Sequence, residues 1–285
     1  MLTRLLVASK PLRVLSLAYN CLLNPAAVAE STLRLINALL YSQYHAQSPE
    51  HNLLKRYQAV LEKLLRQYVT VKSGGIKVNQ KAIAKGLEGF KTGLSQDDFA
   101  SLKLILKAED TRALNIDVSD ILIKYQAKFI EDLRANSSKY SKTLVFVGSD
   151  RQSAYLDKLI AHNTELLYTG HALQVIPQVV KKLGAYYEPV LLGNVFPGDG
   201  AKGLIDRDGI LSLYYQAQQT AFQHQGNPIE FQLYSTGHHA SLISAIKACP
   251  GLLPQGVTLR LRKYAGHAVT ELGKMKGKGQ VDRYY

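Results

Sequence analysis

Three short apolar segments in the second half of the chain end in residues that could bind or transform an anionic ligand. Their polar ends are Ser149-Asp150, Thr169-Gly170 and Ser235-Thr236. An apolar helical pattern follows each of them. In an open α/β sheet the carboxyl ends of parallel strands meet at one edge, where helix N-termini offer free backbone N–H groups to a ligand. We therefore expect Asp150, Thr169, Ser235 and Thr236 to line one crevice, with helix N-capping as the alternative role of the hydroxyl groups.

Short strands alternate with helical patterns after residue 143, which is typical of a parallel sheet with helical crossovers. We expect strands at 144–148, 165–169, 190–195, 229–235 and 257–263. Helices are expected between them at about 152–162, 172–183, 201–224 and 239–248. These elements predict a Rossmann-like, three-layer, mostly parallel α/β domain over residues 141–285, which ends in a basic, solvated C-terminal tail around 274–279.

The first 140 residues carry helical patterns instead. Ser48 and Pro49 form a typical helix start, and apolar residues then recur at helical spacing as far as Tyr68. Further helices are expected at 27–45, 80–93, 96–108 and 117–136. We interpret residues 2–23 as a helix that packs on the core, with a basic helix that touches a membrane surface as the alternative. The sequence thus predicts a helical N-terminal region, or cap, over residues 1–140.

The order of these features resembles a haloacid-dehalogenase-type (HAD) phosphohydrolase. That family has an Asp-x-Asp pair at the end of the first strand, Ser or Thr at the end of the next, a Lys at a helix start and an acidic pair at the end of a later strand. Segment 144–150 matches the first feature, Thr169-Gly170 the second, Lys202 the third and Ser235-Thr236 the fourth. The resemblance covers roughly residues 143–265 and implies a phosphate site with bound Mg²⁺.

Two departures from the family pattern change what the resemblance implies. Gly148 stands where the family has its Asp nucleophile, while Asp150 is kept at the general acid–base and metal position. Ser235 and Thr236 replace the acids that bind Mg²⁺, which prefers carboxylate ligands. The resemblance therefore implies a degenerate phosphatase-like protein. It would bind phosphorylated or anionic partners through a set of phosphate-binding residues: Thr169, Gly170, Lys202, Ser235 and Thr236.

A second register would give an active enzyme. The segment Asp206-Arg-Asp208-Gly-Ile-Leu is similar to the Asp-Arg-Asp-Gly-Thr-Leu motif of other members of the same superfamily. It would make the protein a Mg²⁺-dependent phosphohydrolase that uses Asp206 and Asp208, or Asp150. Only two apolar residues precede this motif where a buried strand is needed, and a helical pattern follows. We therefore interpret Asp206 and Asp208 as acids in the first turn of a helix, where the helix dipole favours them.

The charge of the chain points to acidic partners. Thirty-five Lys and Arg residues stand against 22 Asp and Glu residues, a net charge of +13. Phosphorylated ligands or proteins and an anionic membrane surface fit this charge. Nucleic acid fits less well, because the tyrosines are scattered and no binding module is recognisable. A further alternative is a host- or membrane-interaction protein that works through its helical half.

Localisation is predicted from cysteine usage and hydropathy. Cys21 and Cys249 indicate no disulfide framework, which favours a reducing compartment. No apolar run approaches the length of a membrane span, so we expect a soluble, cytoplasmic protein. The combination of a helical half with a degenerate HAD-like half also resembles effector proteins that intracellular bacteria secrete into host cells.

Overall fold

The computed structural model describes residues 9–73, 75–107, 114, 116–148, 151–163, 165–195, 209–236, 240–266 and 268–281. The chain forms two compact units. The sheet unit comprises residues 1–21, 128–154 and 176–285, and the helical unit comprises residues 22–127 and 155–175. This division differs from the expected boundary near residue 140, because each unit draws on both halves of the chain.

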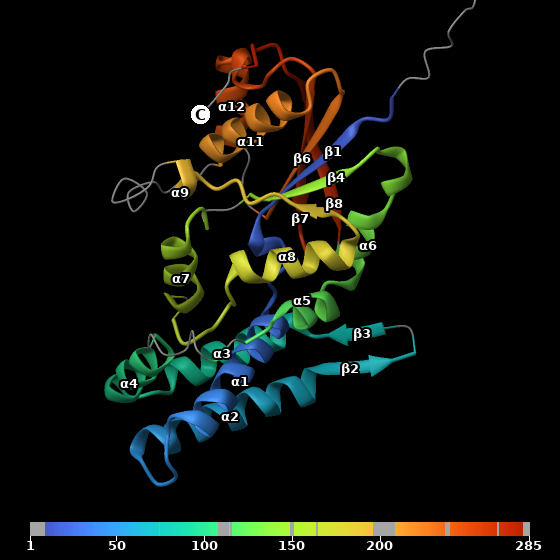
Figure 1. Cartoon of the computed structure of the whole chain (residues 1–285). Coiled ribbons are helices and arrows are strands. Elements are labelled where there is room, and N and C mark those ends of the chain that lie inside the picture. The colour runs from blue at the N-terminus through green and yellow to red at the C-terminus, as the bar shows by residue number, and fades with distance from the viewer. Residues whose placement is uncertain are drawn as a thin grey trace, which may run out of the picture. The chain divides into compact units, whose positions relative to one another are not determined.

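The sheet unit contains a six-stranded sheet in the order β5-β4-β1-β6-β7-β8 (Figure 1). The strands are β1 (Leu12–Leu17), β4 (Thr143–Val147), β5 (Tyr186–Tyr187), β6 (Ile229–Ser235), β7 (Val257–Tyr264) and β8 (Val269–Lys276). All neighbours pair in parallel except β7 and β8. Numbered along the chain, the order is 3-2-1-4-5-6, which is that of a doubly wound α/β sheet. The predicted α/β class with a mostly parallel sheet is confirmed.

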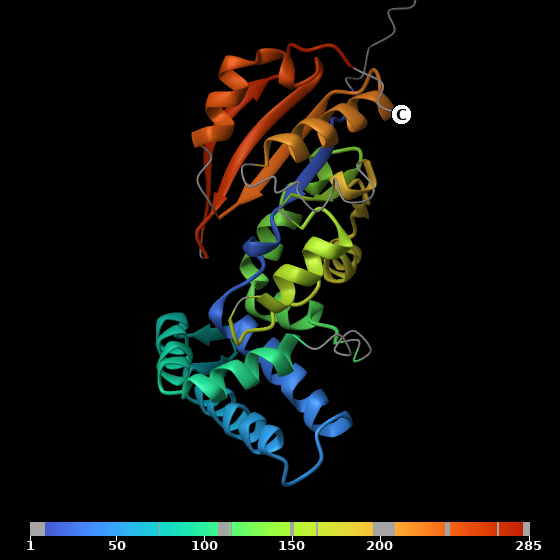
Figure 2. The ribbon, with the colours of Figure 1, turned by 90° about the vertical axis from the view of Figure 1, so that its left-hand side faces the viewer.

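Strand β1 is the centre of this sheet and is buried along its whole length. It pairs with β4 on one side and with β6 on the other. Leu12 and Val14 belong to a core cluster with residues of α11 (Ile210–Gln223) and α12 (Ala240–Ala248). These two helices lie along one face of the sheet (Figures 1 and 2). A strand that is covered on both faces reads as a nearly continuous apolar run, which is why residues 12–17 did not show a strand pattern.

Helix α6 (Ala127–Arg134) packs on the opposite face, which is more polar. The buried guanidinium of Arg13 donates a hydrogen bond from Nη1 to the Leu133 carbonyl at 2.7 Å and faces Oε1 of Gln232. Next to it, Tyr140 donates to Glu230 at 2.7 Å. Burial alone would raise the pKa of Glu230, but hydrogen bonds from Tyr140 and Gln232 and the charge of Arg260 outweigh it and lower that pKa. The charged groups on this face therefore have hydrogen-bond partners within the unit.

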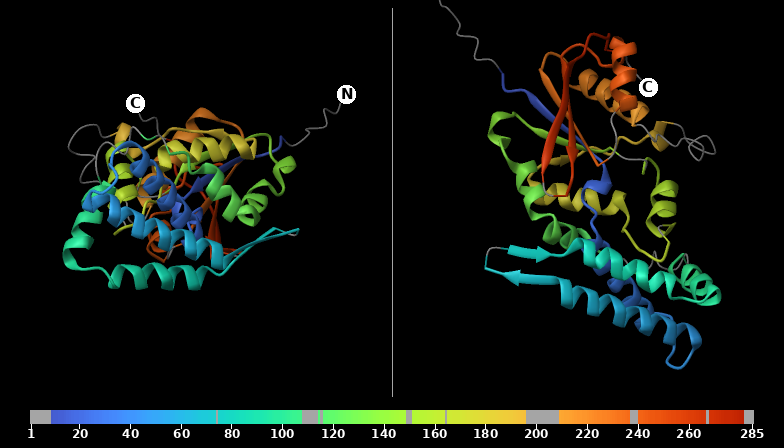
Figure 3. Two further views of the ribbon diagram at one scale, coloured as in Figure 1. Left: turned by 90° about the horizontal axis from the view of Figure 1, so that it is seen from below. Right: turned by 180° about the vertical axis from the view of Figure 1, so that it is seen from behind.

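The helical unit is built mainly from helices, of which α1 and α2 come first along the chain (Figure 3). Its elements are α1 (Pro25–Ser42), α2 (Pro49–Tyr68), the hairpin β2 (Val69–Lys72) and β3 (Gly75–Val78), α3 (Gln80–Thr92), α4 (Gln96–Lys107), α5 (Ser119–Tyr125) and α7 (Ala154–Asn163). Asn24, Ser48 and Asn79 cap α1, α2 and α3 through their side-chain oxygens. Helix α8 (Ala172–Leu183) begins in this unit and ends in the sheet unit.

Several sequence predictions are wrong in instructive ways. Residues 12–17 form β1 rather than part of a helix over 2–23. The helix expected at 117–136 is interrupted at Gln126, which separates α5 from α6. Residues 192–195 form the short helix α9 (Leu192–Val195) rather than a strand. Residues 274–276 of the expected mobile tail belong to β8, although their lysines are exposed as predicted, and Glu271 of this strand forms ion pairs with Arg260 and Arg262.

The remaining short elements are three 3-10 turns. They are η1 (Tyr19–Cys21), η3 (Ser137–Lys139) and η4 (Pro250–Leu252). The first of these directly follows β1, so the chain turns sharply at the carboxyl end of the central strand.

Candidate functional site

The carboxyl ends of β1 and β6 mark the point where the strand order of the sheet reverses. In doubly wound sheets ligands bind at this switch point. Strand β1 is followed by Ala18, Tyr19 and Asn20, and β6 ends in Ser235 and is followed by Thr236. The Ala18 N–H donates to the Tyr234 carbonyl at 3.0 Å, which ties the two strand ends together. Ser235 is half-buried and Thr236 exposed, so the structure places both at the predicted edge of the sheet.

A buried layer of polar side chains lies beside this edge. Ser16 Oγ donates to Gln216 Oε1 at 2.8 Å, and Gln216 Nε2 donates to the Val147 carbonyl at 2.7 Å. Gln152 Nε2 donates to the same carbonyl at 3.0 Å. All these groups are buried, so their mutual hydrogen bonds compensate for the loss of water. Their role is to hold the ends of β1 and β4 and helix α11 in place, rather than to react with a ligand.

Gly148 lies against β1 at a distance that leaves no room for a side chain. Its N–H donates to the Leu17 carbonyl at 2.9 Å. A Cβ atom at this position would lie 2.5 Å from Ser16 Oγ and 2.8 Å from the Ser16 carbonyl carbon. The HAD register at residue 148 stays a prediction, although β4, which that register takes as the first strand, is the second strand of the sheet along the chain. The first strand is β1, and the residues after it are Ala18 and Asn20.

Arg151 is a cation at this edge that the sequence analysis missed. It is only 1% exposed, and its guanidinium lies 4.6 Å from the centre of the Tyr19 ring, directly after β1. Such a cation–π contact stabilises a desolvated guanidinium. Arginine also binds phosphate and carboxylate groups more specifically than lysine does. The signal in the sequence was a basic residue directly after the Ser149-Asp150 pair, at the end of a predicted strand.

Thr169 and Gly170 belong to the helical unit and not to the sheet. Residues 165–169 form no regular strand, and side chains of α1 and α2 form hydrogen bonds with their backbone. Tyr57 donates to the Leu166 carbonyl at 2.8 Å, and Thr32 Oγ1 accepts from the Tyr168 N–H at 2.9 Å. Thr169 is buried and donates its N–H to the Ala161 carbonyl at 3.3 Å.

The other predicted site residues lie outside the described residues. They are Asp150, Lys202, Asp206 and Asp208. Within the described ranges, no three His, Cys, Asp or Glu side chains gather closely enough to hold a metal ion. A Mg²⁺ site at this edge thus stays a prediction that depends on those acids.

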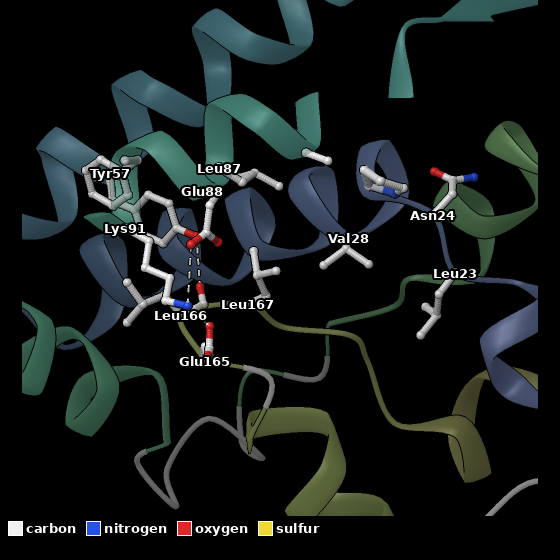
Figure 4. Close-up of a pocket in the computed structure, with 13 residues that line it drawn as sticks. Leu23, Asn24, Val28, Tyr57, Leu87, Glu88, Lys91, Glu165, Leu166 and Leu167 are labelled. Carbon is white, nitrogen blue, oxygen red and sulfur yellow. Dashed lines mark hydrogen bonds and ion pairs between the residues drawn. The ribbon is translucent and has the colours of Figure 1, made fainter. Parts of the chain in front are cut away.

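The helical unit contains a separate pocket of about 350 Å³ (Figure 4). Its walls are mainly apolar and come from α1, α2, α3 and residues 165–167. The rings of Tyr57 and Phe90 stack in its lining with centroids 4.5 Å apart. The volume lies at the lower end of the range for small-molecule sites, so the pocket can hold a small apolar molecule.

Charged side chains stand at one end of this pocket. Lys91 forms ion pairs with Glu165 and, at 3.8 Å, with Glu88 (Figure 4). The hydrogen bond to Glu165 raises the pKa of Lys91. Glu165 has a φ of +40°, a left-handed value that is uncommon outside glycine. Because these charges already neutralise one another in part, nothing about the pocket selects an anionic ligand.

Comparisons with protein-family models, with curated proteins and with solved structures find no match to this chain. None of the helices in the described ranges combines the length and apolar character needed to cross a bilayer. The function must therefore be argued from the geometry of the two units.

Proposed function

We propose that the sheet unit is a degenerate phosphatase-like domain of the HAD type, which binds a phosphorylated or otherwise anionic ligand without hydrolysing it. One observation carries the proposal. At the switch point, β1 is followed by Ala18, Tyr19 and Asn20, and β6 ends in Ser235 and is followed by Thr236. Neither strand end carries an acidic side chain at these positions. A phosphohydrolase of this kind needs acids at the ends of these two strands, one as nucleophile and others as Mg²⁺ ligands.

The chemistry of the replacements favours anion binding. Hydroxyl and amide groups can donate to phosphate oxygens, whereas carboxylates repel them unless a cation lies between. At the same edge the buried guanidinium of Arg151 lies against the ring of Tyr19. The net charge of +13 would also attract an anionic ligand over a distance set by the ionic strength.

The first prediction concerns hydrolysis and binding measured side by side. We expect no Mg²⁺-dependent turnover of p-nitrophenyl phosphate by the purified chain, and saturable binding of inorganic phosphate in a calorimetric titration. Thr236→Val should weaken that binding about tenfold, because it removes one hydrogen bond to a charged group. Thr258→Val is the matched control, since Thr258 is half-buried on β7 of the same sheet and pairs with Glu230 near the amino ends of the parallel strands.

Two results would contradict this proposal. Absence of phosphate binding in the wild-type chain would remove its basis. Mg²⁺-dependent turnover that disappears in Asp150→Asn, Asp206→Asn or Asp208→Asn would establish the alternative, an active phosphohydrolase, and would identify the acid that it uses. A Lys202→Ala variant tests whether the remaining predicted phosphate contact takes part in either case.

A further inference from the structure

More than half of the net charge of the chain is concentrated in one continuous segment of the helical unit. Residues 55–85, named the basic arm below, run from α2 through β2 and β3 into α3. They contain eight Lys or Arg residues and one acid, Glu62, so the arm carries a net charge of +7 out of +13. A basic segment of this kind attracts anionic partners such as a nucleic acid or a membrane surface.

The cations of the basic arm are exposed. Only Arg56 forms an ion pair with a carboxylate within the described part of the chain, at 3.2 Å from Asp98. Lys55 donates to Gln58 instead. The remaining cations lie on the surface along all four elements: Lys63, Arg66, Lys72, Lys77, Lys81 and Lys85. Their charges are therefore available to a partner.

The β2–β3 hairpin at the middle of the arm has one basic and one apolar face. Thr70 pairs with Lys77, and Lys72 lies on the same face two residues further on. Val71 pairs with Ile76 on the other face. Val71 is 75% exposed although it is apolar. The hairpin projects beyond the adjoining ends of α2 and α3 (Figures 1 and 3). Val71 is exposed together with Lys72 and Lys77, and Ile76 is half-buried.

We propose that the basic arm docks on an acidic phospholipid bilayer surface. The hairpin enters the interface with its turn first, so that Val71 and Ile76 reach the boundary of the acyl chains. Lys72 and Lys77 contact the headgroup phosphates, and the helix cations add attraction to the anionic surface. A nucleic acid would match the charge but would leave Val71 exposed. The arm also offers poor platforms for stacking bases, because Tyr57 is buried and Tyr68 half-buried.

This inference goes beyond the phosphate site of the sheet unit and is independent of it. The probe is a set of vesicles made of phosphatidylcholine alone or of phosphatidylcholine mixed with phosphatidylserine, and the readout is co-flotation of the full chain. We expect binding only to the acidic vesicles, with release as the salt concentration rises. The double variant Lys72→Gln/Lys77→Gln should reduce partitioning on the order of thirtyfold. Val71→Asp should also reduce partitioning to the acidic vesicles, measured at the same low salt concentration.

Matched controls are available on α4 of the same unit. Lys103 is exposed there and Leu104 is 73% exposed, so Lys103→Gln and Leu104→Asp repeat the two chemical changes away from the arm. Both control variants should float with acidic vesicles as the wild type does. Thermal unfolding of every variant checks that the fold is kept.

Three outcomes would overturn the proposal. The first is equal binding to neutral and acidic vesicles, and the second is no binding to either. The third is unchanged vesicle binding by Val71→Asp together with binding of short duplex DNA that depends on Lys72 and Lys77, which would make nucleic acid the partner.

Discussion

At the scale of single residues, Gly148 shows how tightly the candidate site is packed. The position directly follows β4, and the main chain of β1 fills the space that a Cβ atom would need. Close packing of β4 against β1 therefore requires that residue 148 has no side chain. The polar side chains nearby are Ser16, Gln152 and Gln216, which form hydrogen bonds with one another or with the main chain.

The Gly148→Ala variant should lower the free energy of unfolding by about 1–3 kcal/mol, the usual cost of overpacking a well-filled site. The clash would involve the main chain of Ser16 and Leu17, which cannot move without disturbing the central strand. Urea denaturation measures this change. Gly89→Ala is the matched control, because a Cβ at that helical position meets no atom within 4 Å. It should be neutral or stabilise by up to about 1 kcal/mol; equal destabilisation by both substitutions would contradict the packing argument.

At the scale of elements, β1 carries the architecture of the sheet unit. It supplies the hydrogen-bond partners of both β4 and β6, and it brings residues from the start of the chain between segments more than 100 residues away. Its end at Ala18, Tyr19 and Asn20 forms one half of the proposed anion site. Without β1, the two edges that it joins would be left with unpaired backbone groups.

The importance of β1 can be tested with a substitution that changes polarity but hardly changes volume. Val14→Thr should destabilise the chain by about 1–3 kcal/mol, because it buries a hydroxyl in a position that is fully shielded from solvent. Val71→Thr, on the exposed strand β2, should change the unfolding free energy by no more than about 0.5 kcal/mol. Similar losses for the two variants would argue against β1 as the buried central strand.

At the scale of the whole molecule, the chain leaves and re-enters each unit. The sheet unit takes β1 from the first residues, while the helical unit takes residues 155–175 from between two segments of the sheet unit. A cut in the sequence at residue 140 therefore does not separate one unit from the other.

Fragments 1–140 and 141–285 should each fail to unfold cooperatively. The second lacks β1 between β4 and β6, and the first lacks the residues 155–175 whose main chain bonds to Tyr57 and Thr32. Thermal unfolding followed by circular dichroism, with the full chain as reference, measures this. A sharp transition in fragment 141–285 alone would show that the α/β half forms a domain without β1.

The sequence by itself determined the elements whose signals are local. Helix 49–68 follows from its Ser48 cap and one apolar face, and α8 and β6 lie at the residues that their patterns predicted. Ser235 and Thr236 at the end of β6 follow from the same local reading. Such predictions hold because caps and periodicity depend on residues within a few positions of one another.

Only the tertiary structure decided which elements belong together. Residues 12–17 became the central strand because neighbours from distant segments bury both of their faces, which removes the alternation that marks a strand. Thr169 belongs to the helical unit, where its neighbours form hydrogen bonds with α1 and α2, and Gly148 lies against the main chain of β1. Each of these outcomes depends on contacts across more than 100 residues of sequence, and no local pattern encodes them.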